Sequence, residues 1–236
     1  MPQDMFTPDE ALSFVTEKLG VKSAQARMTS DRKNLLDEVV TAVQTELPFS
    51  NINLLRVSTE SRCRPSLEEI KADIISGVGG LCYNLNVATF FLLKALGYDS
   101  VLVHGTCTSS VIFPNNHINV LVSNVEKLGD KFLVETAFGF PTFRAINLNF
   151  EKESPVFRDS FLEYKYMKHE GQILRMHRQG DLAPRSNLPE GVLFVLDGWR
   201  RFYFCDTSGT TNIEEFYADF DEVRLMQSNF FQLILT

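Results

Sequence analysis

The chain has 236 residues, of which 44% are hydrophobic and 22% charged, and its net charge is −7 at pH 7. This length and composition are typical of a globular protein with a substantial core, in one large domain or a few closely packed lobes. The negative charge argues against a nucleic-acid partner or an anionic membrane surface, because both attract basic proteins. Neither an apolar run of about eighteen residues nor an apolar stretch at the amino terminus is present, so we expect no membrane-spanning helix and no secretory signal.

Helical patterns run through residues 1–97. Capping boxes, in which a Thr or Ser caps a helix and a Glu three positions later reaches back, occur at 7–10 (TPDE) and 66–69 (SLEE). Apolar residues at helical spacing predict another helix over 35–47. The run CYNLNVATFFLLKAL at 82–96 has almost no polar face, so it predicts a central, buried helix.

From residue 98 the pattern changes to runs rich in β-branched and aromatic residues. These runs predict strands at 99–108, 116–125 and 131–140, and EKLGD at 126–130 predicts a hairpin turn between the last two. Residues 150–190 are polar and interrupted by prolines, which predicts long connections. The remaining predicted elements are a hairpin centred on Asp197-Gly198, a helix over 212–226 and a terminal strand over 230–236.

The segment GVGGLCYNLN at 77–86 brings the chain through glycines to Cys82, at the start of the buried helix. A helix amino terminus favours the thiolate, the reactive form of cysteine. Cys82 is therefore a candidate nucleophile, although a buried cysteine is also a common core residue. The cysteines lack disulfide-scaffold or zinc-site spacing, so we expect reduced thiols in a cytoplasmic protein and no metal. Cys107 and Cys205 are predicted to be core residues, and His177 is predicted to be solvated.

Two further residues are candidate partners of this thiol. His117 begins a predicted strand, and a side chain at a strand end can project into a cleft. Glu135 lies in an apolar stretch of the next strand, where an unpaired charge is costly. If the hairpin turns near 126–128, the two residues come roughly opposite each other. A carboxylate that holds an imidazole, which takes a thiol proton, is the cysteine form of a catalytic triad. Each residue alone is more simply interpreted as structural, and only the ordered set favours catalysis.

The motifs VGGLC (78–82), HINVL (117–121) and ETAFG (135–139) resemble, in order and spacing, those of the arylamine N-acetyltransferase family. The family has an Arg-Gly-Gly-x-Cys turn into a helix, a later strand that begins with histidine, and an Asp-x-x-Phe-Gly strand. The segment ELPFSNINL at 46–54 is similar to the family's Pro-Phe-Glu-Asn-Leu segment. The resemblance extends over most of the chain.

This resemblance implies an α+β fold of the cysteine-proteinase type. A helical lobe over 1–97 would carry the nucleophile, a β-barrel lobe over 98–190 the histidine and the acid, and a short α/β part over 191–236 would follow. The implied activity is an acyl transfer of the ping-pong type. An acetyl group would pass from acetyl-CoA, through an acetyl-cysteine, to a small arylamine, hydrazine or hydroxylamine.

The resemblance also implies residue roles. Cys82 would attack the thioester, His117 would activate the thiol, and Glu135 would orient His117. The implied substrate-binding residues are Phe138 and Gly139 at the acceptor pocket, and Val103, His104 and Gly105. The amides near Cys82, together with the backbone of residues 103–105, would help to hold the thioester oxygen.

Several positions depart from the family pattern. Glu135 replaces the usual aspartate, and Asn84 stands where many members have glutamate. Val78 and Ser50 replace an arginine and a glutamate that are expected to pair, so the double loss leaves no orphaned charge. The chain also ends before the usual carboxy-terminal lobe, which predicts a more open cleft and weaker CoA binding. Two alternatives stay open: a thioesterase or amidase with the same three residues, and a catalytically silent relative that binds a small molecule or a partner.

Overall fold

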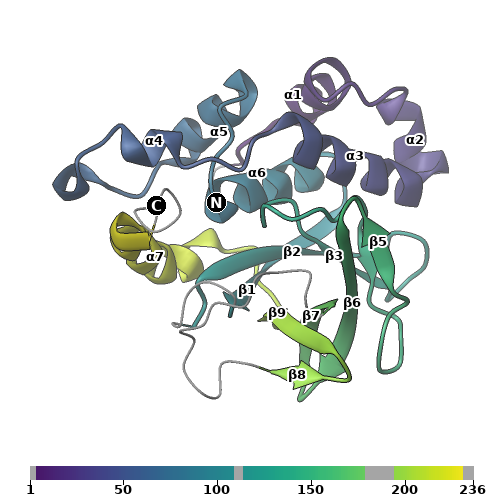
Figure 1. The fold of residues 1–236 in the computed structure, drawn as a ribbon. Helices are drawn as coiled ribbons and strands as arrows, with labels where there is room; N and C mark the ends of the chain where they lie inside the picture. The colour runs from purple at the N-terminus through teal and green to yellow at the C-terminus, as the bar shows by residue number, and fades with distance from the viewer. Residues whose placement is uncertain (1–3, 109–113, 179–193, 231–236) are drawn as a thin grey trace.

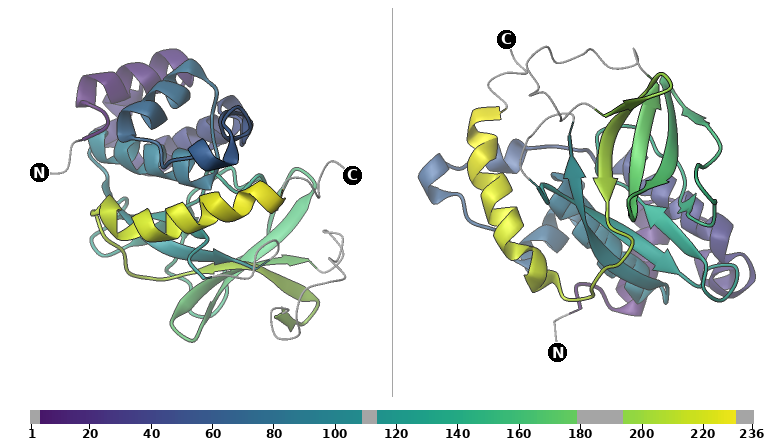
Figure 2. Two further views of the ribbon diagram at one scale, coloured as in Figure 1. Left: turned by 90° about the vertical axis from the view of Figure 1, so that its left-hand side faces the viewer. Right: turned by 90° about the horizontal axis from the view of Figure 1, so that it is seen from below.

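The computed structural model of the protein describes residues 4–108, 114–178 and 194–230. A layer of helices covers one face of a curled antiparallel sheet, and the last helix runs along the side of that sheet (Figure 1 and Figure 2). The α-helices are α1 (Pro8–Ser13), α2 (Ala24–Ser30), α3 (Arg32–Glu46), α4 (Ile52–Leu55), α5 (Leu67–Ser76), α6 (Cys82–Ala95) and α7 (Tyr217–Phe230). Shorter turns are the π-helix η1 (Phe14–Lys18) and the 3₁₀ turns η2 (Thr59–Ser61) and η3 (Ile213–Phe216).

Both predicted capping boxes are confirmed. Before α1, the hydroxyl of Thr7 accepts from the backbone N–H of Glu10 at 3.2 Å, and the Glu10 carboxylate accepts from the backbone N–H of Thr7 at 2.9 Å. Ser66 and Glu69 form the same pair at the start of α5. The central helix α6 is also confirmed, because nearly all of its residues are buried.

The strands form one antiparallel sheet in the order β4-β3-β2-β1-β9-β7-β6-β5, with β8 paired to β9. Their bounds are β1 (Asp99–Cys107), β2 (His117–Ser123), β3 (Lys131–Val134), β4 (Ile146–Asn147), β5 (Phe157–Asp159), β6 (Leu162–His169), β7 (Gln172–Arg178), β8 (Val195–Leu196) and β9 (Trp199–Cys205). The predicted turn at 126–130 joins β2 to β3, and the predicted hairpin at Asp197-Gly198 joins β8 to β9.

The prediction of long connections over 150–190 is wrong for the part that the structure describes, because β5, β6 and β7 lie between 157 and 178. The pattern misled because polar residues of these strands are buried. Lys165 is 9% exposed, Arg175 0% and His177 1%, so alternation of apolar and polar letters does not mark the two faces. The prediction that His177 is solvated is wrong for the same reason.

The sheet has a core on each face. One apolar cluster fills the space between the helices and residues such as Ile118, Val120 and Phe132 on β2 and β3. A second cluster joins Leu121 and Leu133 to residues of β6, β7 and β9, including Tyr166. Because these strands are far apart in the sheet order, their shared cluster requires the sheet to curl on itself.

The architecture confirms the predicted α+β fold, with amino-terminal helices, a curled antiparallel sheet of half-barrel form and a short carboxy-terminal helix. The division at residues 97 and 190 stays a prediction. The predicted terminal strand over 230–236 lies outside the described residues, apart from Phe230, with which α7 ends. No helix in the described ranges has both the length and the apolar character needed to cross a membrane.

Candidate active site

The glycines before Cys82 allow two backbone segments to meet. Gly79 has a φ of +73°, and a Cβ atom at this position would lie 2.0 Å from the carbonyl oxygen of Pro48. The N–H of Gly80 donates to that carbonyl at 3.2 Å, and the carbonyl of Gly80 accepts from the N–H of Ser50 at 3.0 Å. The turn therefore requires glycine, and these contacts hold the start of α6 against residues 48–50.

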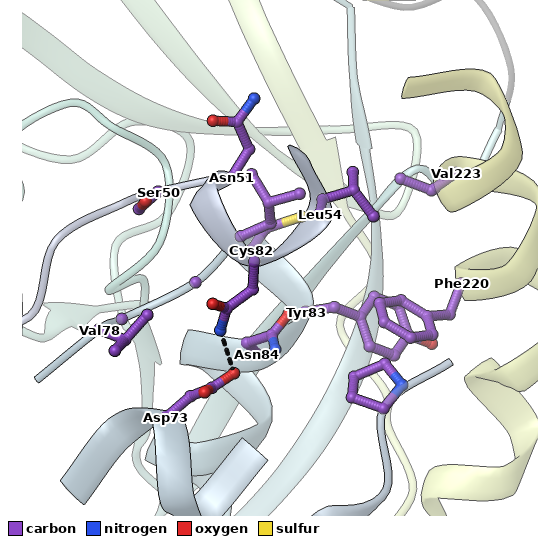
Figure 3. A pocket seen from close by; sticks show the side chains of 15 residues that line it. Ser50, Asn51, Leu54, Asp73, Val78, Cys82, Tyr83, Asn84, Phe220 and Val223 are labelled. Atoms are coloured by element: carbon purple, nitrogen blue, oxygen red, sulfur yellow. Dashed lines mark hydrogen bonds between the residues drawn. The ribbon is translucent and has the colours of Figure 1, made fainter. Parts of the chain in front are cut away.

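Cys82 is the first residue of α6, and its side chain is 8% exposed. No side chain caps this helix at Leu81, so its first N–H groups stay available to a bound anion or carbonyl oxygen. Cys82 lines a pocket of about 610 Å³, part of it open to solvent, together with residues of the 50–54 segment and of α7 (Figure 3). Cys82 thus borders a pocket that is open to solvent.

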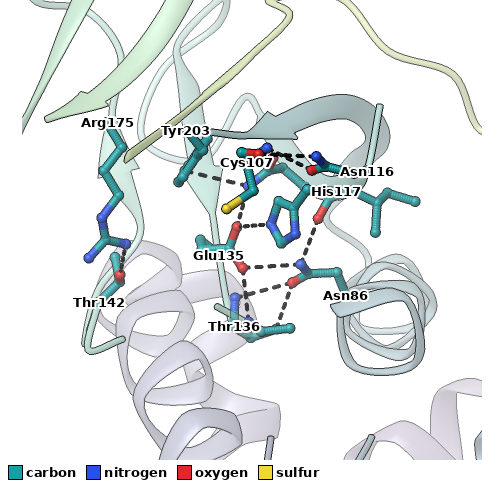
Figure 4. A network of polar contacts seen from close by, with 12 residues as sticks. Asn86, Cys107, Asn116, His117, Glu135, Thr136, Thr142, Arg175 and Tyr203 are labelled. Carbon is teal, nitrogen blue, oxygen red and sulfur yellow. Dashed lines mark hydrogen bonds and ion pairs between the residues drawn. The ribbon is translucent and has the colours of Figure 1, made fainter. Parts of the chain in front are cut away.

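His117 and Glu135 meet as the sequence predicted. The register of β2 and β3 pairs Val120 with Val134, so Glu135, just beyond β3, comes opposite Asn119 and on the same face as His117. His117 Nε2 lies 2.6 Å from Glu135 Oε2 (Figure 4). The two side chains are 4% and 0% exposed, respectively.

The Glu135 carboxylate is surrounded by hydrogen-bond donors. Its Oε2 accepts from His117 and from the side-chain amide of Asn119. Its Oε1 accepts from Asn86 Nδ2 at 3.1 Å and from the backbone N–H of Ala137 at 2.9 Å. A fully buried group that faces only donors is in the environment of an ionised carboxylate, which accepts at both oxygens and donates at neither.

These neighbours make His117 strongly basic. Burial alone would lower the pKa of this imidazole, but the Glu135 carboxylate and a hydrogen bond with the Cys82 side chain outweigh it and raise the pKa to about 10. Because Nε2 is engaged with Glu135, Nδ1 is the nitrogen that serves Cys82. The arrangement is therefore a thiol, an imidazole and a carboxylate connected in that order, which can hold a thiolate beside an imidazolium.

Two of the five predicted substrate-binding residues lie beside the imidazole. The ring of Phe138 packs edge-on against His117 at 4.2 Å between centroids. Gly105 pairs with His117 across β1 and β2, and a Cβ atom at Gly105 would lie 3.4 Å from the imidazole.

The other three predicted residues have different contacts. Gly139 is exposed next to Phe49. Val103 is buried in the cluster inside the curl of the sheet, and His104 stacks on Phe216 at 4.1 Å, beside α7. The substrate-binding role of all five residues stays a prediction.

Three of the departures from the family pattern lie in the pocket. Ser50, Val78 and Asn84 all line it (Figure 3). Ser50 and Val78 lie on the two segments that the Gly80 hydrogen bonds join, so two uncharged residues stand where a charged pair was expected. Asn84 packs tightly on Gly80, where a Cβ atom would lie 2.5 Å from the Asn84 Cβ.

Sequence reasoning missed the polar residues that hold Glu135. Asn86 and Asn119 contact its carboxylate, and Gln44 of α3 donates to its backbone carbonyl at 2.6 Å. A signal was present for two of them: Asn86 interrupts an apolar helix, and Asn119 follows His117 by two residues on the same strand face. In the described parts of the chain, no group of three or more His, Cys, Asp or Glu side chains could hold a metal ion.

The fold is similar to that of bacterial arylamine N-acetyltransferases. The enzyme of Mycobacterium abscessus matches with a TM-score of 0.65 and 17% identity, over 94% of this chain and 69% of that one. An enzyme of Bacillus cereus, reported with a Cys-His-Glu catalytic triad, matches with a TM-score of 0.65 and 20% identity, over 91% of this chain and 76% of that one. The Mycobacterium marinum enzyme in complex with CoA matches with a TM-score of 0.66 and 17% identity, over 88% and 69% of the two chains.

A search of curated protein sequences found no match. The structural matches share too little sequence to establish more than the fold. The family is established by sequence, because the model of a family described as N-acetyltransferase matches residues 34–217. The chain therefore belongs to the arylamine N-acetyltransferase family.

Proposed function

We propose that the protein transfers an acetyl group from acetyl-CoA to a small arylamine, hydrazine or hydroxylamine through an acetyl-Cys82 intermediate. The observation that carries the proposal is the connected set of Cys82, His117 and Glu135 at the start of a buried helix. The Cys-His-Glu triad of the Bacillus cereus relative and the CoA bound by the Mycobacterium marinum relative support it. Because this donor is an intracellular metabolite and the cysteines are free, the proposal includes a cytoplasmic location.

In the first half-reaction, the Cys82 thiolate attacks the carbonyl carbon of the thioester. The new C–S bond forms, the bond from the carbon to the CoA sulfur breaks, and CoA leaves as a thiol with the proton from His117. The N–H groups at the start of α6, which Leu81 does not cap through its side chain, would stabilise the oxyanion. Glu135 keeps the imidazolium in place and stabilises its charge.

In the second half-reaction, the amine nitrogen attacks the acetyl-cysteine. Neutral His117 takes the proton of the amine, the bond between the carbonyl carbon and Cys82 Sγ breaks, and the thiolate–imidazolium pair is restored. Phe138, edge-on to His117, offers an aromatic surface to a flat acceptor at the point where the proton is removed.

Intact-protein mass spectrometry after incubation with acetyl-CoA tests the first half-reaction. We expect one acetyl group on the native protein and on the Cys63→Ala variant, and none on Cys82→Ala. Cys63 is the matched control because it is a free, exposed cysteine. Addition of an arylamine or a hydrazine is then expected to remove the adduct and yield the acetylated amine.

Other outcomes identify the alternatives. Loss of the adduct in buffer as fast as with amine would indicate a thioesterase that uses water as acceptor. Absence of the adduct, together with alkylation of Cys82 slower than that of Cys63, would reject the enzyme and favour a silent, ligand-binding relative.

A further inference from the structure

A second buried charge lies in the same lobe as Glu135. Arg175, on β7, is 0% exposed, yet none of the ion pairs found among the described residues includes its guanidinium. Its hydrogen bonds go to uncharged groups, among them the carbonyl of Pro141 at 3.0 Å and His177 Nε2 at 2.8 Å. Burial and the charges of Arg175 and Arg200 lower the pKa of His177, so this neighbour is neutral. A buried arginine without an anion beside it is costly, which calls for a reason.

The charges of the candidate active site supply that reason. When Cys82 is a thiolate and His117 an imidazolium, the carboxylate of Glu135 leaves the buried set with one net negative charge. In the low-dielectric interior, such a net charge disfavours the thiolate. The single positive charge of Arg175 balances it.

A chain of hydrogen bonds connects the two charges. Asn119 Nδ2 donates to Glu135 Oε2 and, at 3.5 Å, to the hydroxyl of Tyr203. Tyr203 is hydrogen-bonded to Tyr166, whose hydroxyl also accepts from Arg175 Nη1 at 3.5 Å. All members of this chain are buried, so water does not screen the interaction between its ends.

Arg175 also holds the segment that follows Glu135. Its guanidinium donates to the hydroxyl of Thr142 (Figure 4). It also donates to the carbonyl of Pro141. Gln44 holds the same segment from α3, because it donates to the carbonyl of Glu135 and accepts from the N–H of Thr142 at 3.0 Å. Residues 135–142, which carry Phe138, are thus fixed at both ends.

We propose that Arg175 is a positioning residue of the acyl-transfer site, which balances the net charge of Cys82, His117 and Glu135 and fixes the segment behind Glu135. The inference rests on the proposed function only for its role in turnover. The charge balance itself is tested without acetyl-CoA, through the reactivity of Cys82.

The test measures the alkylation rate of Cys82 by iodoacetamide as a function of pH, by peptide mass spectrometry in a Cys63→Ala background. Arg175→Met is expected to move the midpoint of the acidic limb upward by about half a pH unit or more, which is about a threefold slower rate at fixed pH on that limb. Arg175→Lys keeps the positive charge, so its midpoint is expected to lie close to that of the native protein. Arg158→Met is the matched control, because the Arg158 side chain is 73% exposed, and it should leave the midpoint unchanged.

An unchanged midpoint in folded Arg175→Met would overturn the charge-balancing role, whatever the loss of stability. If Arg175→Met fails to fold, the alkylation midpoint of the Tyr166→Phe variant tests the proposal instead. This variant keeps the ring but cuts the hydrogen-bonded chain, and an upward shift smaller than about half a unit is expected. No shift in that variant would reject the proposal. Failure of acetyl transfer with a shifted midpoint would reject the proposed function and leave the role of Arg175 intact.

Discussion

Replacement of Glu135 by glutamine tests the central contact of the site most sharply. Glutamine has nearly the same shape as glutamate, but one of its two terminal groups donates hydrogen bonds. In the native protein both carboxylate oxygens accept, from Asn86 and Ala137 on one side and from His117 and Asn119 on the other. The new NH₂ group must therefore face two donors in either orientation.

The two orientations of the glutamine amide differ in how well the neighbouring hydrogen-bond donors can adjust to it. The N–H of Ala137 belongs to the backbone and cannot reverse its polarity. Asn119 can turn its amide, because its Oδ1 has no hydrogen-bond partner, and the imidazole of His117 can present a lone pair at Nε2. We therefore expect the NH₂ group on the side of His117 and Asn119, and a loss of about 1–3 kcal/mol in the free energy of unfolding.

That orientation disables the imidazole. If Nε2 accepts from the new amide, the proton of neutral His117 sits on Nδ1, the nitrogen that serves Cys82. His117 also loses the carboxylate that holds its pKa near 10, so the thiolate–imidazolium pair is less favoured. Acetylation of Cys82 should slow by about 10⁴-fold, the loss found when a triad aspartate is replaced by its amide.

Two measurements check this prediction: urea unfolding followed by circular dichroism, and the rate of Cys82 acetylation by quenched-flow mass spectrometry. Glu170→Gln is the matched control, because the Glu170 side chain is 84% exposed, and both quantities should stay at the native values. An acetylation rate within about tenfold of the native rate in folded Glu135→Gln would refute the role assigned to the carboxylate.

Two further predictions follow from the same geometry. Nitrogen NMR of labelled histidines should find His117 protonated and His177 neutral at pH 7 to 9. The reason is that the pKa of His117 is raised to about 10, whereas burial lowers the pKa of His177. Equal charges on the two rings would contradict this prediction. Gly79→Ala should lower the free energy of unfolding by about 3 kcal/mol or more, because φ is positive and the new Cβ would clash with Pro48. Gly129 also has a positive φ, but a Cβ atom there would have no neighbour within 4 Å, so Gly129→Ala should lower it by only about 1 kcal/mol. Equal losses for the two alanines in urea unfolding would contradict the close approach.

Local rules in the sequence were sufficient for most of the elements. The capping boxes, the apolar run of α6 and the turn at 126–130 each depend on neighbouring residues, and each was confirmed. The strands β5 to β7 could not be predicted in this way. Their polar residues are buried by partners far along the chain, as in the contact of Arg175 with Pro141.

The same distinction between local contacts and contacts of distant segments applies to the candidate site. Cys82, His117 and Glu135 were predicted as a set. His117 and Glu135 meet because the β2–β3 hairpin is local and its register follows from its turn. Cys82 comes from the start of α6, so its contact with His117 depends on how that helix packs on the sheet. The side chains that donate hydrogen bonds to Glu135 and were not predicted come from α3, α6 and β2. Only tertiary packing decides which polar side chain meets the carboxylate, so sequence patterns alone could not name them.

The two segments beside Cys82 are held together without the charged pair that the family pattern predicts. Ser50 and Val78 stand at the expected positions of that pair, yet the two segments that carry them are joined by backbone hydrogen bonds of Gly80. The close approach at Gly79 adds a steric requirement that depends on no side-chain charge. Replacing both members of a buried ion pair by uncharged residues is often neutral, whereas replacing one is costly. The start of α6, and with it Cys82, is therefore positioned by the glycines. The lining of the pocket carries less charge at these two positions than the family pattern predicts.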